Sequence, residues 1–201
     1  GDVYMRANYQ DFQRYQPVDI AMAADVEATL PSLIEAIRMA LDDAGRARVQ
    51  SRTQNARTAA ARIKEGDIAA AAQDAWNATP ISCARMCMEL WPHIQNEDWG
   101  FVSRDATFGS WPRRFWNFER HHQWIGGPGG HGQGYHLPAA VGAALAHRDA
   151  GRIAVNIQGD GDFMFTSSAL WTAAHHNIPL LTIVHNNRAY HQEVMHLQRM
   201  C

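Results

Sequence analysis

Two polar residues, Asp160 and Asn187, each follow a run of apolar residues. Asp160 stands between two glycines. The runs Arg152–Gln158 and Leu180–His185 predict two buried strands, and the pattern over residues 166–176 between them predicts a helix. Two strands joined by a helical crossover are parallel, and the connection is right-handed. Because loops that leave the carboxyl ends of parallel strands meet at one edge of the sheet, we expect Asp160 and Asn187 to lie close together.

The oxygen atoms gathered at this edge suit a magnesium ion that carries a diphosphate. Mg²⁺ prefers octahedral oxygen coordination with one or two carboxylates and phosphate oxygens. Asp160 can supply a carboxylate oxygen, Asn187 an amide oxygen and Ala189 a backbone carbonyl, while Gly159 and Gly161 let the backbone approach the anion closely. The alternative is ordinary turn chemistry, because Asp-Gly and Asn are common at strand ends.

Three blocks of sequence resemble the acetolactate synthase and 2-oxoacid decarboxylase superfamily, whose members use thiamine diphosphate (ThDP). Residues 159–187 resemble its ThDP signature and read GDGDFMFTSSALWTAAHHNIPLLTIVHNN. Residues 130–144 resemble its glycine-rich segment before an LPAA helix and read GHGQGYHLPAAVGAA. Residues 25–34 resemble the end of its central domain and read DVEATLPSLI. The resemblance implies a C-terminal diphosphate-binding domain that holds ThDP and Mg²⁺.

The resemblance also assigns roles to individual residues. The Mg²⁺ ligands are Asp160, Asn187 and the carbonyl of Ala189. The residues that lie against the diphosphate, the third of them mainly through its backbone N–H, are Gly159, Gly161, Asp162 and Phe163. The residues that pass beside the cofactor rings are His131, Gly132, Gln133 and Gly134. In many members a bulky apolar residue bends the cofactor at the position of Gln133, so this chain departs from the pattern there.

Two further residues are candidates for acid–base catalysis. Glu193 stands six residues after Asn187, where some decarboxylases of the superfamily carry an acid that helps to protonate or release product. A carboxyl group in an apolar, enclosed site gains a raised pKa and can act as an acid. His191 lies beside it in sequence. The alternative for Glu193 is a first-turn helix carboxylate that the helix dipole favours.

The resemblance implies an acetolactate-synthase-like lyase or carboligase, dependent on ThDP and Mg²⁺, that acts on 2-oxo acids or aldehydes. One alternative is a simple 2-oxoacid decarboxylase, which Glu193 favours. An alternative of another class is a non-catalytic ThDP-binding subunit that needs a partner chain, because the activating glutamate of the superfamily is expected outside this chain. We expect a homo-oligomer, a dimer or tetramer, with the active site between subunits. FAD, which some relatives bind, is neither predicted nor excluded by these residues.

The expected architecture is α/β, with a parallel sheet and helices on both faces. Residues 1–45 predict the last strand and helix of a central domain, with a strand at Val18–Ala23, a helix cap at Thr29 and a helix stop at Gly45. Residues 46–75 predict a polar helical linker, and residues 76–201 the ThDP-binding domain, incomplete at its C-terminus. We therefore expect the chain to be a fragment or the ordered part of a larger protein.

Within residues 76–201 the pattern predicts a further set of elements before the second strand. Ile81–Trp91 predicts an amphipathic helix, Trp99–Ser103 a strand and residues 104–125 a long structured loop. A helix is expected from Pro138 to His147. Gly159–Asp162 predicts a turn. The crossover helix is expected to be capped by Thr166 or Ser167.

Composition excludes several classes of protein. Of the 201 residues, 46% are hydrophobic and 19% charged, which favours a globular domain. The net charge of −2 and the absence of Lys/Arg runs argue against nucleic-acid binding. No stretch approaches 18 apolar residues, so no membrane span is expected. The three cysteines, of which Cys83 and Cys87 favour buried thiols over a metal pair, fit a reducing cytoplasm.

Other patterns carry weaker alternatives. Gly127–Gly132 fits G-x-G-x-x-G, but a dinucleotide site needs a buried strand before it and an acidic residue closing the next strand, so NAD binding is not expected. Adjacent histidines point in different directions on a helix, which argues against a zinc site. The histidines that could face the active site rather than the surface are His121, His122, His131 and His136. The aromatic residues over 111–118 favour a core or domain interface over a substrate cage.

Overall fold

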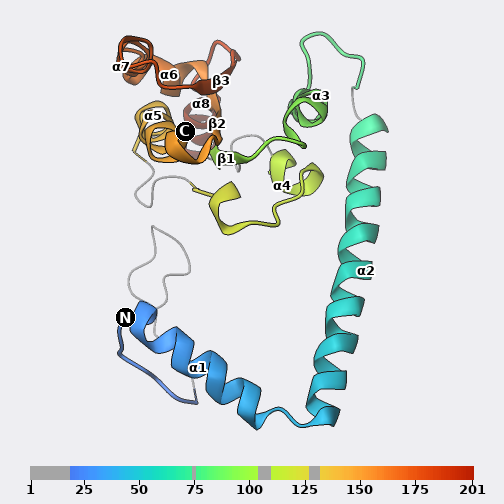
Figure 1. The fold of residues 1–201 in the computed structure, drawn as a ribbon. Helices are drawn as coiled ribbons and strands as arrows, with labels where there is room; N and C mark the ends of the chain where they lie inside the picture. Colours follow the sequence, from blue (N-terminus) through green and yellow to red (C-terminus); the bar gives the residue numbers. More distant parts are fainter. Residues whose placement is uncertain (1–18, 74–75, 104–109, 127–131) are drawn as a thin grey trace. The chain divides into compact units, whose positions relative to one another are not determined.

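A computed structural model describes residues 19–73, 76–103, 110–126 and 132–201 (Figure 1). The chain divides into two compact units, residues 1–65 and residues 66–201. No helix within the described ranges is long and apolar enough to cross a membrane.

The first unit contains α1 (Val26–Ala40) and the greater part of α2 (Asp43–Gln73). The cap of α1 is Asp25 rather than Thr29, because the Asp25 carboxylate accepts a hydrogen bond from the Ala28 amide at 2.8 Å. The helix ends at Ala40, and Gly45 is not its stop but lies inside α2. The Asp42 carboxylate accepts from the Gly45 amide at 2.6 Å and thereby starts the next helix.

The predicted strand at Val18–Ala23 is wrong for the residues that can be assessed. Residues 19–25 form no strand, and Val18 lies outside the described ranges. A strand needs a neighbour to satisfy its backbone N–H and C=O groups, and the sheet of the described residues consists of three strands from the second unit.

The second unit is built on a three-stranded parallel sheet in the order β1-β2-β3. The strands are β1 (Trp99–Val102), β2 (Ile153–Gly159) and β3 (Leu180–His185). Two short helices, α6 (Asp160–Phe165) and α7 (Ala169–His175), connect β2 to β3. The predicted helical crossover between parallel strands is confirmed.

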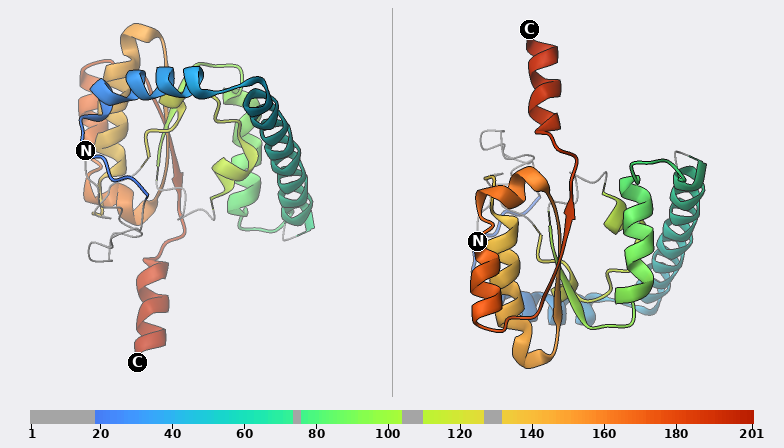
Figure 2. Two further views of the ribbon diagram at one scale, coloured as in Figure 1. Left: turned by 90° about the horizontal axis from the view of Figure 1, so that it is seen from below. Right: turned by 90° about the horizontal axis from the view of Figure 1, so that it is seen from above.

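Helices cover both faces of this sheet, as Figure 2 shows. On one face α3 (Cys83–Ile94) and α4 (Trp111–Phe115) pack against Trp99, Phe101 and Ile157. On the other face α5 (His136–His147) and α7 pack against Ala154. Side chains of a strand alternate between the two faces, so successive residues of β2 enter different cores. The predicted α/β fold with helices on both faces is confirmed.

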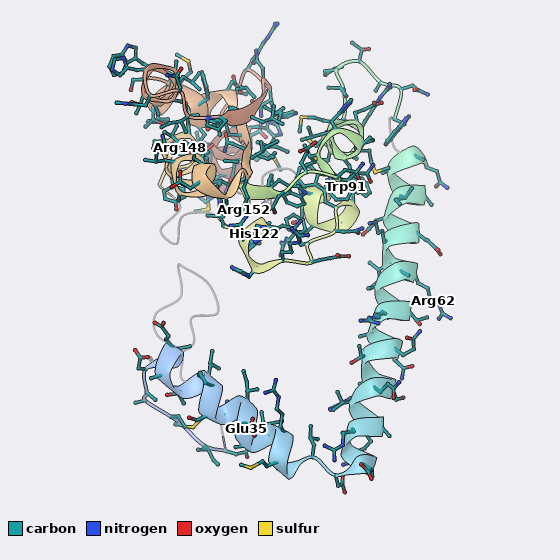
Figure 3. The ribbon with its side chains drawn as sticks, viewed as in Figure 1. Glu35, Arg62, Trp91, His122, Arg148 and Arg152 are labelled. Carbon is teal, nitrogen blue, oxygen red and sulfur yellow. The ribbon has the colours of Figure 1, made fainter. Side chains whose placement is uncertain are left out.

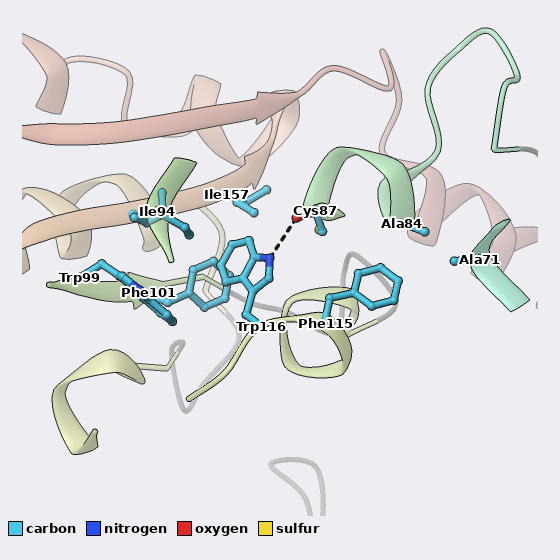
Figure 4. Packing of buried hydrophobic residues seen from close by; sticks show 10 residues of the cluster. Ala71, Ala84, Cys87, Ile94, Trp99, Phe101, Phe115, Trp116 and Ile157 are labelled. Atoms are coloured by element: carbon cyan, nitrogen blue, oxygen red, sulfur yellow. Dashed lines mark hydrogen bonds between the residues drawn. The ribbon is translucent and has the colours of Figure 1, made fainter. Parts of the chain in front are cut away.

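Aromatic side chains fill the core on the α3 side. Trp116 stacks on Trp91 at 6.0 Å between ring centroids and meets Trp99 edge to face at 5.8 Å. The indole N–H of Trp116 donates to the Cys87 carbonyl at 2.9 Å, which satisfies a buried donor (Figure 4). The aromatic run is therefore core, as the sequence favoured.

Three local predictions in this unit need correction. The segment Gly159–Asp162 is not a turn, because α6 begins at Asp160 directly after β2. The N-cap of α7 is Ser168, and the Thr166 hydroxyl instead donates to the Gly134 carbonyl at 2.8 Å. The expected loop over residues 104–125 contains α4 and a 3₁₀ turn at His121–Gln123, while residues 104–109 lie outside the described ranges.

An ion-pair cluster joins the starts of β1 and β2. The Asp98 carboxylate precedes β1 and accepts from Arg152 Nε at 2.9 Å, and His122 Nε2 lies 2.6 Å from its other oxygen. Arg152 and His122 are labelled in Figure 3. Arg120 reaches the same carboxylate at 3.3 Å. The hydrogen bonds from His122 and then Arg152 lower the pKa of Asp98 below its ordinary value of 3.8.

We expect Asp98→Asn to lower the melting temperature at pH 7 and to remove part of the acid sensitivity of folding. Because the pKa of Asp98 is lower in the folded chain, its contribution is present above about pH 3.8 and is lost as the pH falls through the folded value. Thermal melts between pH 2 and 7 measure this. Asp149→Asn, whose side chain is 94% exposed, is the control. Equal acid profiles for Asp98→Asn and the unmodified chain would contradict the assignment.

Candidate functional site

The parallel register brings two polar loops to the carboxyl edge of the sheet. Gly159, the last residue of β2, pairs with His185, the last residue of β3. Asp160 follows the first strand directly, and Asn187 follows the second by two residues. The structure therefore places these two residues at adjacent strand ends, as the sequence predicted.

Asp160 has a carboxylate oxygen that lacks a protein partner. Its Oδ1 is buried and makes no hydrogen bond within the described part of the chain. Burying a carboxylate oxygen without a partner costs free energy, so this atom can accept a ligand that the described residues do not supply. A divalent cation suits a carboxylate oxygen in this position.

The loop after β3 presents the other two candidate ligands. The Asn187 amide oxygen accepts from the Ala189 amide at 3.1 Å, which closes a tight turn around Arg188 in the left-handed region at φ 56°. An amide oxygen has two lone pairs, so Asn187 keeps one for a cation. Carboxylate, amide and backbone carbonyl oxygens are all ligands that Mg²⁺ accepts, so the residues present fit this ion.

The glycines beside Asp160 differ in their surroundings. A Cβ atom at Gly159 would meet nothing within 4 Å, which leaves open space for a ligand beside the strand end. A Cβ atom at Gly161 would lie 2.5 Å from Cε1 of Tyr190, and the Tyr190 hydroxyl is 3.5 Å from the Gly161 carbonyl. Tyr190 thus covers the backbone of α6, a contact that the sequence analysis missed.

The glycine-rich segment is tied to α6. The Gly134 amide donates to Asp162 Oδ1 at 2.6 Å, and His136 Nδ1 lies 2.6 Å from Asp162 Oδ2. Both oxygens of Asp162 are therefore occupied, and a contact of this residue with a diphosphate would use its backbone N–H. Gly132 and Gln133 are exposed just before this point, and His131 lies outside the described residues.

The two catalytic candidates stand at the start of α8 (His191–Met200). The side chains of His191 and Glu193 are exposed. The remaining diphosphate candidate, Phe163, is half-buried in α6. An enclosing apolar wall for Glu193 would have to come from outside the described chain, and the roles of both residues remain proposals.

A cysteine and a histidine meet near the same edge of the sheet. Cys83 Sγ, at the start of α3, lies 3.5 Å from Nε2 of His185 at the end of β3. Burial raises the pKa of Cys83, and burial together with Cys83 raises the pKa of Cys87 to about 12. Both thiols are therefore protonated at neutral pH and contribute as packing groups.

Comparisons with known proteins place this edge of the sheet in context. Residues 106–200 match the family model described as "Thiamine pyrophosphate enzyme, C-terminal TPP binding domain". A Mycobacterium tuberculosis protein, provisionally named an acetolactate synthase large subunit, is 42% identical over 79 residues, which are 39% of this chain and 15% of the relative. The chloroplastic acetolactate synthase of Arabidopsis thaliana is 37% identical over 78 residues, which are 39% of this chain and 11% of the relative.

Among solved structures, the ThDP-dependent 4-hydroxybenzoylformate decarboxylase of Rhodococcus jostii RHA1 is similar with a TM-score of 0.50 and 28% identity. The match covers 56% of this chain and 21% of that one. The matched parts therefore span a minor share of the length of each relative.

We expect Gly134→Ala to destabilise the second unit by about 1–3 kcal/mol. Gly134 has φ +81°, and an added Cβ would lie 2.8 Å from Phe165 Cβ and 3.0 Å from Thr166 Cγ2. Urea denaturation followed by tryptophan fluorescence measures the loss. Gly132→Ala is the matched control, because a Cβ there meets nothing within 4 Å. Equal midpoints for the two variants would contradict the geometry.

Proposed function

We propose that the chain binds Mg²⁺ and the ThDP diphosphate at the carboxyl edge of its sheet, from the premise that residues 106–200 form a C-terminal ThDP-binding domain of the thiamine pyrophosphate enzymes. The observation that carries the proposal is the buried, unpartnered Oδ1 of Asp160 at the end of β2. Its neighbour across the sheet edge is the loop that contains Asn187.

The proposal gives each side chain a binding or orienting task. Asp160, Asn187 and the Ala189 carbonyl would hold the metal. The backbone of residues 159–163 would face the diphosphate, with open space at Gly159. Gly132 and Gln133 would lie beside the cofactor rings, as would His131. When bound, ThDP supplies the electron sink that C–C cleavage next to a carbonyl requires.

We propose an acetolactate-synthase-like lyase or carboligase that acts on 2-oxo acids. Its support is that the relatives reported above are named acetolactate synthases and are 37–42% identical to this chain over 78–79 residues. The second candidate is a simple 2-oxoacid decarboxylase. Its support is Glu193 in the first turn of α8, together with a similar solved structure named as a 4-hydroxybenzoylformate decarboxylase. Product analysis with a single 2-oxo acid separates them. A carboligase joins two substrate molecules with loss of one CO₂, whereas a decarboxylase converts each substrate molecule into one aldehyde and one CO₂.

Exposed apolar side chains on three helices support a homo-oligomer with the active site between subunits. Phe165, Trp171 and Leu197 of α6, α7 and α8 are 59–66% exposed. Phe165 also contacts the ring of Tyr190 edge to face, and exposed apolar groups that lie together are typical of association surfaces. In this arrangement a partner subunit would contribute the activating glutamate. A non-catalytic ThDP-binding subunit remains the alternative of another class, and it would gain activity only when a second chain is added.

We propose that residues 1–45 are the last part of a central domain, residues 46–75 a linker and residues 76–201 the ThDP-binding domain. Support comes from α1, which has no buried residue. Its apolar side chains Leu30, Ile34 and Ile37 recur at helical spacing and are exposed. Such a stripe is typical of a helix that packs on a core.

We expect calorimetric titration of the native protein to show ThDP binding that requires Mg²⁺ and that Asp160→Ala weakens at least about 100-fold, since second-shell changes alone cost 10–100-fold. The reason is that Asp160 is the one carboxylate of the proposed metal site. Asp149→Ala, a change of the same type at an exposed position, serves as the control and is expected to bind as the native protein does. Absence of binding to the native protein, or equal binding by Asp160→Ala, would refute the proposal.

A further inference from the structure

The two aspartates of α6 stand two residues apart and have opposite surroundings. Asp160 Oδ1 is buried and has no hydrogen-bond partner within the described chain. Asp162 has both carboxylate oxygens occupied, one by the Gly134 amide and one by His136 Nδ1, each at 2.6 Å. The same residue type in the same short helix is thus open to a ligand in one case and closed by the protein in the other.

Gly134 is held from both sides by the crossover. Its amide donates to Asp162, and its carbonyl accepts from the Thr166 hydroxyl at 2.8 Å. Its φ of +81° and the close approach of Phe165 Cβ leave no room for a side chain. The glycine-rich backbone is therefore fixed at this residue to the helix that carries Asp160.

His136 completes this arrangement at the first turn of α5. Its side chain is 7% exposed, and that of Asp162 is 12% exposed. Hydrogen bonds to a carboxylate are short and strong when the group is removed from water. The N-cap of α5, Tyr135, makes no side-chain cap hydrogen bond, and the Asp162 carboxylate contacts the next residue, His136, at the start of this helix.

We propose that Asp162 and His136 are positioning residues that lock the glycine-rich segment in place beside the cofactor rings. We call Asp162, His136, Gly134 and Thr166 the Asp162 latch. The inference rests on the proposed function and assigns different roles to the two aspartates of α6. In this proposal Asp160 binds the metal. The side chain of Asp162 binds no ligand and instead fixes the position of the backbone that carries Gly132 and Gln133.

The latch has a consequence for exchange of backbone amide hydrogens. The Gly134 amide of the native protein without ligand is protected by its bond to Asp162. Asp162→Ala removes that acceptor, so deuterium uptake in the peptide over residues 132–137 becomes at least about tenfold faster, which corresponds to the ordering of about one residue. Asp160→Ala is expected to leave the uptake unchanged, because Asp160 Oδ1 makes no hydrogen bond to this segment within the described residues.

Binding of two probes separates positioning from metal binding. With Mg²⁺ present, inorganic diphosphate reports on the metal and phosphate contacts alone, whereas ThDP reports on the rings as well. Asp162→Ala is expected to lower the affinity for ThDP about tenfold relative to the affinity for diphosphate, since it releases the segment beside the rings. Asp160→Ala is expected to weaken both.

The conservative variant Asp162→Asn guards against a simple loss of folding. Its amide oxygen still accepts from Gly134, and its amide nitrogen can donate to the neutral tautomer of His136. We expect it to restore slow exchange at Gly134 and the native preference for ThDP over diphosphate. The Asp162 latch is supported if Asp162→Asn keeps the native exchange rate and ThDP preference while Asp162→Ala loses both.

Each other outcome overturns a specific statement. The positioning role would be overturned if Asp162→Ala exchanged its amide hydrogens at the native rate. It would also be overturned if this variant bound ThDP and diphosphate with equally weakened affinity. If the native protein binds neither probe, the proposed function fails. In that case, deuterium uptake by the ligand-free native protein and by ligand-free Asp162→Ala still decides whether Asp162 holds the glycine-rich segment.

Discussion

The parallel pairing of β2 with β3 is the constraint on which the site depends. Gly159 and His185 are paired at the last position of both strands, so the chain leaves the sheet at one edge twice. A shift of this register by one residue would turn every side chain of β3 to the opposite face and would move the Asn187 loop away from Asp160. The register is fixed by the two cores, because Leu181 and Ile183 join the α3 side while Leu180 joins the α5 side.

The short helix that follows β2, α6, carries two aspartates whose carboxylates have different contacts. One buried carboxylate oxygen of Asp160 has no hydrogen-bond partner within the described residues, whereas both oxygens of Asp162 bond to the glycine-rich segment. The proposed metal site and the segment beside the proposed ring site are therefore connected through the same helix. Gly161 between the aspartates is covered by Tyr190, which brings the start of α8 against the same helix. These contacts make α6 the element that connects the proposed metal site to the other parts of the candidate site.

The parts of this arrangement that follow from local pattern could be predicted from the sequence. β3 was predicted with its exact bounds because LLTIVH is a continuous apolar run with a proline before it and polar residues after it. The parallel crossover followed from the strand–helix–strand order. Glycine-rich Gly159–Asp162 favours a turn by propensity, yet α6 begins there, because tertiary packing overrides local preference. Asp162 with Gly134 and Cys83 with His185 are 28 and 102 residues apart, and no periodicity relates such pairs.

Our central proposal is that a divalent cation binds between Asp160 and the Asn187 loop together with the diphosphate of ThDP. The most direct measurement is a crystal structure of the native protein grown with ThDP and Mn²⁺ in place of Mg²⁺, with anomalous diffraction data to locate the metal. We predict one strong anomalous peak at oxygen-ligand distance, about 2.0–2.3 Å, from Asp160 Oδ1, Asn187 Oδ1 and the Ala189 carbonyl. A cofactor bound with its metal elsewhere, or an Asp160 carboxylate still without a ligand, would contradict the account.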